Sequence, residues 1–136
     1  MFLAIKTNED PAEIYLLREN GDEIAKKIWD AGRTLAKNLL GELEKLLRES
    51  DKDFDAKKPF ANISGIIIFQ GPGSFTGLRI GITVANAIAY AQNVAIVGTN
   101  GENWLTKGLE KLREKQNDKI VLPEYGAAPH ITQPKK

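Results

Sequence analysis

The fold of this chain is decided by the stretch GIIIFQGPGSFTGLRIG, residues 65–81. Residues 65–70 form an apolar run rich in β-branched and aromatic side chains, which is typical of a strand buried on both faces in a parallel sheet. A glycine-rich turn follows, and residues 75–92 then predict a helix. Residues 94–98 predict another apolar strand, so the order strand, helix, strand indicates a βαβ unit of an α/β fold.

The rest of the chain predicts a meander of strands and two further helices. The strands are expected at residues 2–7, 13–18 and 23–29, and the helices at residues 33–50 and 102–116. The Asn20-Gly21 pair suits a two-residue hairpin turn in the meander. We therefore expect one α/β domain with a mixed five-stranded sheet over residues 1–119, followed by an extended, proline-containing tail over residues 120–136.

The composition excludes several kinds of site. The chain has no cysteine and a single histidine, His130, so disulfides, thiolate chemistry and the common zinc patterns have no ligands to use. A net charge of +1 makes strong attraction to nucleic acid by this chain alone unexpected. No window approaches the about 20 apolar residues that span a bilayer, and the first residues do not resemble a secretory signal. We expect a cytoplasmic protein.

The turn Gly71-Pro72-Gly73 opens a helix, where backbone N–H groups and partial positive charge collect. Ser74 or Thr76 can supply the oxygen that caps the helix. A Walker loop needs a lysine that this turn does not contain, and the dinucleotide fingerprint fails because the last glycine comes one residue late. Two interpretations stay open: a turn that contacts an anion or a partner, and glycines that only permit a tight reversal.

The helix after the turn has an unusual surface. Charged residues are absent over residues 80–93, and a helix that is apolar nearly all round is covered on nearly all sides. Small residues recur every four positions at Gly77, Gly81, Ala85 and Ala89. Such a ridge lets another backbone approach closely, either this domain's own sheet or a foreign helix. The pattern alone leaves both possibilities open.

The sequence GPGSFTGLRIG, residues 71–81, closely resembles the signature of the TsaB (YeaZ) family, bacterial subunits of the machinery that makes threonylcarbamoyladenosine in tRNA. The resemblance covers about residues 1–115. It implies a single lobe of the actin-like ATPase, ribonuclease-H-like fold, without the second lobe that usual members carry. It also implies a non-catalytic subunit that pairs with the TsaD-like transferase subunit through its first two helices.

The resemblance further implies that a TsaE-like ATPase joins the pair and that tRNA is contacted indirectly, through the complex. ATP or ADP and magnesium would then belong to the partner subunits, and this chain would have no cofactor, metal or catalytic residue of its own. The docking surface carried over from the family consists of Leu39, Leu43, Leu46, Ser74, Phe75, Thr76, Gly77, Leu78, Arg79, Gly81, Ile82, Ala85 and Ile88, beside the turn residues Gly71, Pro72 and Gly73.

One position departs from the family pattern. Lys6 stands at the end of the first strand, where members commonly have an acid that lies near the metal in the related ATPases. An ammonium group does not ligate magnesium, so independent ATP hydrolysis becomes less expected. The alternatives are a homodimer that uses the same apolar helices, a weak nucleotide-binding protein that uses the Gly71 turn, and a protease-like protein, for which the sequence offers only scattered serines.

Overall fold

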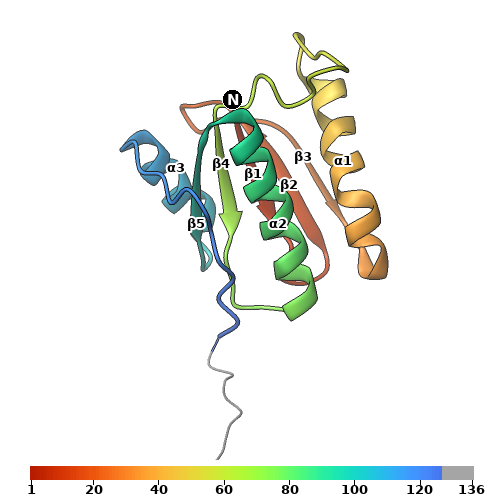
Figure 1. Ribbon diagram of the computed structural model, residues 1–136, viewed down its shortest axis with the longest axis vertical. Helices are drawn as coiled ribbons and strands as arrows, with labels where there is room; N and C mark the ends of the chain where they lie inside the picture. Colours follow the sequence, from red (N-terminus) through yellow and green to blue (C-terminus); the bar gives the residue numbers. More distant parts are fainter. Residues whose placement is uncertain (127–136) are drawn as a thin grey trace, which may run out of the picture.

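The computed structural model describes residues 1–126, and a five-stranded sheet lies at its centre (Figure 1). The strand order is β3-β2-β1-β4-β5. β1 and β3 are antiparallel to β2, whereas β1, β4 and β5 are parallel to one another. The predicted α/β class with a mixed five-stranded sheet is therefore confirmed. The strands are β1 (Phe2–Lys6), β2 (Ala12–Leu17), β3 (Glu23–Trp29), β4 (Gly65–Phe69) and β5 (Ala95–Thr99).

Helices cover both faces of the sheet (Figure 1). They are α1 (Leu35–Ser50), which follows a 3₁₀ turn at Gly32–Thr34, α2 (Phe75–Gln92) and α3 (Trp104–Arg113). Ala4 and Ile67 are register partners on one face, and Gly108 of α3 lies against Ile67. Thr7 is an odd number of positions beyond Ala4 and points to the other face, where it meets Gly81 of α2. α1 covers that second face beside α2.

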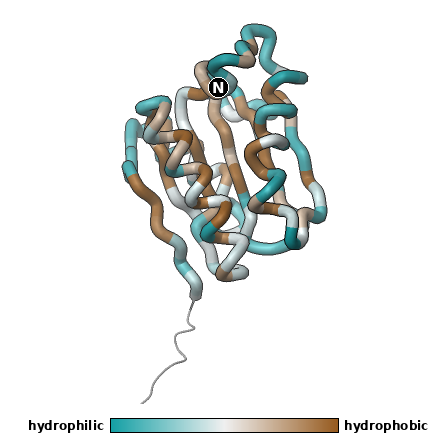
Figure 2. Tube along the Cα trace, turned by 45° about the vertical axis from the view of Figure 1, so that its right-hand side comes forward, coloured by the Kyte–Doolittle hydropathy of each residue, from teal (hydrophilic) through white to brown (hydrophobic). Residues whose placement is uncertain are grey.

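The core lies between the helices and the middle of the sheet, where β1 and β4 pair. Figure 2 shows the hydrophobic residues concentrated in the strands and along the helices. The apolar run that we identified in the sequence forms β4, and all of its residues are buried, as expected for a central strand. The large, fully buried side chains of β1 and β4 are Leu3, Ile5, Ile66, Ile67 and Ile68.

The predicted two-residue hairpin turn at Asn20-Gly21 is wrong. β2 ends at Leu17 and β3 begins at Glu23, so residues 18–22 form a longer connection. Within it only Gly21 has a positive φ, of 102°, whereas the two-residue turn that favours Asn-Gly requires positive φ at both central positions.

The last helix is shorter than the predicted range of 102–116. It begins at Trp104, after the N-cap Asn103, and ends at Arg113. Lys115 has a φ of 66°, which lies in the left-handed region, so the helical backbone cannot continue through it.

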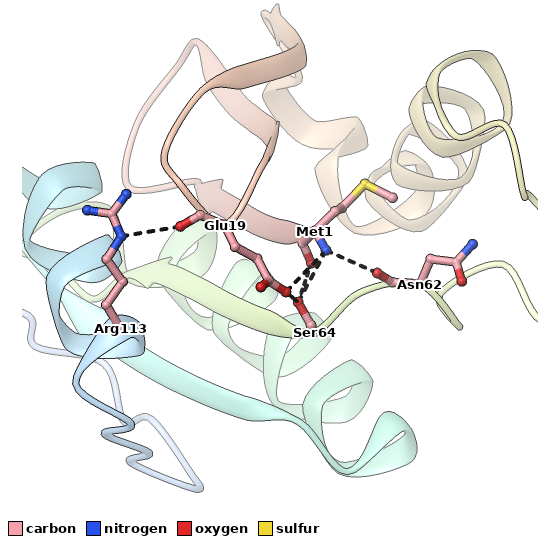
Figure 3. Close-up of polar contacts among 5 residues, drawn as sticks. All are labelled: Met1, Glu19, Asn62, Ser64 and Arg113. Carbon is pink, nitrogen blue, oxygen red and sulfur yellow. Dashed lines mark hydrogen bonds and ion pairs between the residues drawn. The ribbon is translucent and has the colours of Figure 1, made fainter.

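Polar contacts tie together the end of the sheet where β1 and β4 begin (Figure 3). The amino group of Met1 donates to Ser64 Oγ over 3.2 Å, and Ser64 Oγ donates to a carboxylate oxygen of Glu19 over 2.7 Å. Arg113 Nε donates to the backbone oxygen of Glu19 over 3.2 Å, which joins α3 to the meander. This cluster lies at the opposite end of β4 from the glycine-rich turn, because the turn follows the last residue of that strand.

The outer edge of β5 is closed by the chain itself. Ile96 N donates to Asn117 Oδ1, and Ile96 O accepts from the backbone N–H of Asp118. Gly98 N donates to Asp118 Oδ2 over 2.8 Å, and Gly98 O accepts from Lys111 Nζ over 3.1 Å. These bonds occupy groups that an added strand would need, so β5 is protected from edge-to-edge pairing.

The predicted tail, residues 120–136, is described only as far as residue 126. Its first residues run without regular secondary structure and hydrogen-bond to Asn86 and Gln70. The boundary that we placed after residue 119 stays a prediction. His130 lies outside the described residues.

Candidate functional site

The glycine-rich turn is held between two other segments of the chain. A Cβ on Gly71 would lie 1.9 Å from the backbone oxygen of Glu124, and Gly71 has a φ of 134°. A Cβ on Gly73 would lie 2.4 Å from Cβ of Asn8, in the segment after β1. Close approach therefore requires both glycines, and the positive φ of Gly71 favours glycine there for a second reason.

Ser74 caps the helix that follows the turn. Its side-chain oxygen accepts from Gly77 N over 3.3 Å, and its backbone N–H donates to Asn8 O over 2.7 Å. The first bond satisfies one of the free N–H groups at the start of α2. Of the two capping residues that the sequence offered, the structure uses Ser74.

The ridge of small residues on α2 faces the chain's own sheet. A Cβ on Gly77 would lie 2.3 Å from Thr7 O, and a Cβ on Gly81 would lie 2.1 Å from Thr7 Oγ1. Thr7 Oγ1 donates to Gly77 O over 2.7 Å, and Ala85 further along the ridge has no exposed surface. The question that the sequence left open is thus answered: the small residues allow α2 to approach the end of β1.

The structure divides the residues of the expected docking surface into two groups. The members whose side chains or Cα atoms are buried against this chain's own sheet and helices are Leu39, Leu43, Leu46, Leu78, Gly81, Ile82, Ala85 and Ile88. The exposed members are Ser74, Phe75, Thr76 and Arg79, with Gly77 half-buried. Only the exposed members have side chains that another molecule could contact without a change in this fold.

A groove runs between α1 and α2 on the outside of the molecule, with a volume of about 410 Å³. Three of the residues expected to dock line it, together with four others. We call this region the α1–α2 surface, and its residues are Ala36, Phe75, Thr76, Arg79, Ile80, Thr83 and Val84. The signal in the sequence was the uncharged run over residues 80–93, but this run does not tell which side of the helix is covered by the sheet.

Phe75 and Arg79 form the prominent part of the α1–α2 surface. Phe75 is 57% exposed, and the guanidinium carbon of Arg79 lies 5.0 Å from the centre of its ring. A cation near a helix N-terminus is unfavourable beside the macrodipole, and the face of an aromatic ring offsets part of that effect. Exposed aromatic and arginine side chains of this kind are enriched at the energetically important centres of protein interfaces.

Lys6 is engaged by neighbouring side chains on the other face of the sheet. Its ammonium nitrogen lies 3.7 Å from a carboxylate oxygen of Glu13, 3.9 Å from one of Glu9 and 5.1 Å from the centre of the Phe69 ring. The Tyr15 hydroxyl donates to Glu13, and burial is the main cause that raises the pKa of Tyr15. Within residues 1–126 no cluster of three or more His, Asp or Glu side chains is arranged to hold a metal ion.

The strand order β3-β2-β1-β4-β5, with only β2 antiparallel to the others, and helices on both faces, define the class of the protein. It is one lobe of the actin-like ATPase, ribonuclease-H-like fold. The solved structure of YeaZ from Pseudomonas aeruginosa superposes with a TM-score of 0.65 at 26% sequence identity, covering 84% of this chain and 49% of that one.

Sequence comparisons give the family. The model of a family described as "TsaD: tRNA N6-adenosine threonylcarbamoyltransferase" matches residues 29–123. The chain belongs to this TsaD/TsaB (YeaZ) family, and the predicted resemblance is confirmed. The family description and the names of its relatives refer to threonylcarbamoyladenosine in tRNA.

Two TsaB proteins and one transferase illustrate the relation. TsaB of Bacillus subtilis is 32% identical over 94 residues, which are 69% of this chain and 38% of that protein. TsaB of Haemophilus influenzae is 22% identical over 115 residues, 85% of this chain and 45% of that protein. A tRNA N6-adenosine threonylcarbamoyltransferase of Geotalea daltonii is 38% identical over 58 residues, 43% of this chain and 15% of that protein. The chain spans less than half the length of each.

In the part of the chain that the structure describes, no helix has both the length and the apolar character that crossing a bilayer requires.

Proposed function

We propose that this chain is a non-catalytic subunit of the complex that makes N6-threonylcarbamoyladenosine in tRNA, and that it dimerises with and activates a TsaD-like transferase subunit. The observation that carries the proposal is the α1–α2 surface: a groove of about 410 Å³ lined by uncharged residues of α1 and α2, with Phe75 and the single charged residue of the lining, Arg79, at one end. The family relation to TsaB proteins supplies the pathway.

The groove has the chemistry of a docking surface. Ile80 and Val84 are half-buried along it, and Thr83 and Ala36 are exposed, so apart from Arg79 at one end its wall is formed by uncharged side chains. Burial of such a wall against a partner removes apolar surface from water, at roughly 25 cal/mol per Å². Contiguous apolar surface framed by polar residues is typical of protein interaction sites.

At the β5 edge of the sheet, docking by strand addition is opposed. Because hydrogen bonds from Asn117, Asp118 and Lys111 close β5, a partner does not add a strand there without breaking them. A helix-to-helix contact needs no free backbone groups. The α1–α2 surface offers such a contact, with two helices that pack against each other.

The catalytic chemistry belongs to the partners in this proposal. Lys6 forms ion pairs with Glu9 and Glu13 where the related ATPases place an acid near their metal, which favours a chain that binds no magnesium. ATP or ADP and magnesium then belong to the TsaD-like subunit and to a TsaE-like ATPase that joins the pair. Contact with tRNA is made through the complex, in the cytoplasm.

The proposal is tested by the rate at which the cognate TsaD-like subunit, with the other pathway components and tRNA, forms the modified nucleoside. We expect the rate to rise when this chain is added, and the rise to be lost with Thr83→Arg, which puts a long charged side chain in the groove. Tyr90→Arg is the matched control, because Tyr90 is 91% exposed on the same helix and does not line the groove.

Two results would contradict the proposal. In one, the chain leaves the rate unchanged at every ratio of the two proteins. In the other, the chain forms the product without a transferase subunit, which would make it an enzyme in its own right.

A further inference from the structure

The segment at residues 120–126, which we call the strap, is bound to the same side of the molecule as α2. Asn86 of α2 holds it by two hydrogen bonds: Nδ2 donates to Val121 O over 2.9 Å, and Oδ1 accepts from Val121 N over 3.0 Å. The side chain of Val121 is 2% exposed and lies against Gly98 of β5. In Figure 2 the first residues of the strap form a hydrophobic stretch that runs toward the grey trace.

A second attachment guides the strap over the glycine-rich turn. Gln70 follows β4 directly, and its Nε2 donates to Leu122 O over 2.9 Å while its backbone oxygen accepts from Glu124 N over 2.9 Å. The missing side chain of Gly71 makes room for Glu124 O. The strap is therefore fixed at three successive places before it reaches Tyr125.

Tyr125 ends on the α1–α2 surface. Its ring stacks on the ring of Phe75, with centroids 4.7 Å apart and planes inclined by 27°, and Phe75 in turn lies under the Arg79 guanidinium. Phe75 and Tyr125 remain 57% and 36% exposed, so both rings keep free surface beside the groove. The bonds to Asn86 and Gln70 already hold the strap, and the stacking adds an aromatic ring to a surface that the sequence assigned to the first two helices.

We propose that the strap is an integral part of the docking surface and that Tyr125 contacts the TsaD-like subunit; this inference rests on the proposed function. The stack restricts the rotamers of Phe75 before the partner arrives, which lowers the side-chain entropy that binding would otherwise remove. Tyrosine supplies a rigid ring with a hydroxyl at its edge, the combination that is enriched at interface centres. The docking surface thus has contributions from three separate segments of the described chain: α1, α2 and the strap.

The test measures the affinity of the full chain for the cognate TsaD-like subunit by titration calorimetry, below the melting temperature of the least stable variant. We expect Tyr125→Ala to weaken binding about tenfold, the equivalent of roughly 1.4 kcal/mol, because both a contact and the support of Phe75 are lost. Tyr125→Phe keeps the stack and should stay within about threefold of the wild type. Leu122→Ala is the matched control: Leu122 is 69% exposed on the same strap, and Gln70 bonds only its backbone.

The possible outcomes distinguish a failure of the inference about the strap from a failure of the proposed function. If Tyr125→Ala binds as tightly as the wild type while Thr83→Arg does not bind, the strap lies outside the interface and the proposed function stands. If Leu122→Ala weakens binding as much as Tyr125→Ala, the effect is not specific to the stacked ring and the inference is wrong. If the wild-type chain does not bind the subunit, the proposed function fails, and the inference with it.

Discussion

Thr7 sets how closely α2 approaches the sheet. It follows β1, its hydroxyl donates to Gly77 O, and its side chain fills the space that a Cβ on Gly81 would occupy. At this contact the backbone of α2 packs directly against Thr7 at the end of β1, with no helix side chain between them. It also fixes the start of α2, and with it the place of Phe75 and Arg79 on the outer surface.

We predict that Gly81→Ala lowers the free energy of unfolding by about 1–3 kcal/mol through overpacking. Rotation of Thr7 would break its bond to Gly77 O, and its Cβ, which does not move, stays in tight contact at 3.2 Å from the new Cβ. Gly41→Ala is the control: it is also a helical glycine, but nothing lies within 4 Å of its Cβ position. That change should raise stability by about 0.5–1 kcal/mol through helix propensity. Urea unfolding compares the two, and equal effects would place Gly81 outside the core.

Tyr15 predicts a pH dependence of stability. Its pKa is raised in the folded chain, chiefly by burial and then by the bond to Glu13. The folded chain therefore keeps the phenol proton at a pH where the unfolded chain, with an ordinary pKa of about 10, loses it. This contribution to stability is complete below about pH 10 and is lost as the pH rises further. Urea unfolding from neutral pH to about pH 11 should show a steeper alkaline loss for the wild type than for Tyr15→Phe. Identical profiles would contradict the assignment.

At the scale of elements, α2 has one covered face and one exposed face because one of its sides packs against the sheet. The sheet covers Gly77, Gly81 and Ala85, while Thr76, Arg79 and Thr83 remain exposed. α1 is simpler, because its buried leucines form one amphipathic stripe. The strap completes this layer on the other side of α2, next to β5.

The strap should detach when its bonds to α2 are removed. Asn86→Ala deletes both hydrogen bonds to Val121 and leaves a backbone N–H and C=O without these partners, at a cost of about 1–3 kcal/mol. We expect the Val121 amide to exchange its hydrogen much faster in this variant, while amides of β1 keep the wild-type rate. Tyr90→Ala is the control on the same helix. Unchanged exchange at Val121 would show that the strap is held by other contacts.

The sequence predicted the elements well because each has a local cause. Periodicity identified α1, the apolar run identified β4, and the glycine-rich turn placed the start of α2 within the βαβ unit. The hairpin connection and the end of α3 were missed because they depend on single backbone conformations, at Gly21 and Lys115, that no side-chain pattern reports.

The docking residues were predictable only in part. The uncharged run over residues 80–93 of α2 is evident from the sequence, but the side of the helix that meets the sheet depends on Thr7, far away in the chain. The stacking of Tyr125 on Phe75 depends on the path of the strap, and that path is set by Asn86 and Gln70 rather than by any motif. Contacts between distant segments of this kind are therefore visible only in the fold.

At the scale of the whole molecule, the described chain closes the β5 edge of the sheet and presents a groove on α1 and α2. The bonds at Ile96 and Gly98 seal β5, and the α1–α2 surface with Tyr125 presents a groove with aromatic residues at one end. The same face could pair two copies of this chain, which is the rival to a complex with a TsaD-like subunit. A homodimer of this chain and a complex with a TsaD-like subunit differ in mass and in composition.

The most direct measurement is light scattering on the eluate of a size-exclusion column, for this chain alone, the cognate TsaD-like subunit alone, and their mixture. We predict a new species in the mixture with the mass of one copy of each protein, which Thr83→Arg abolishes and Tyr90→Arg preserves. A mixture that elutes as the two separate proteins, with masses unchanged from those measured alone, would contradict it.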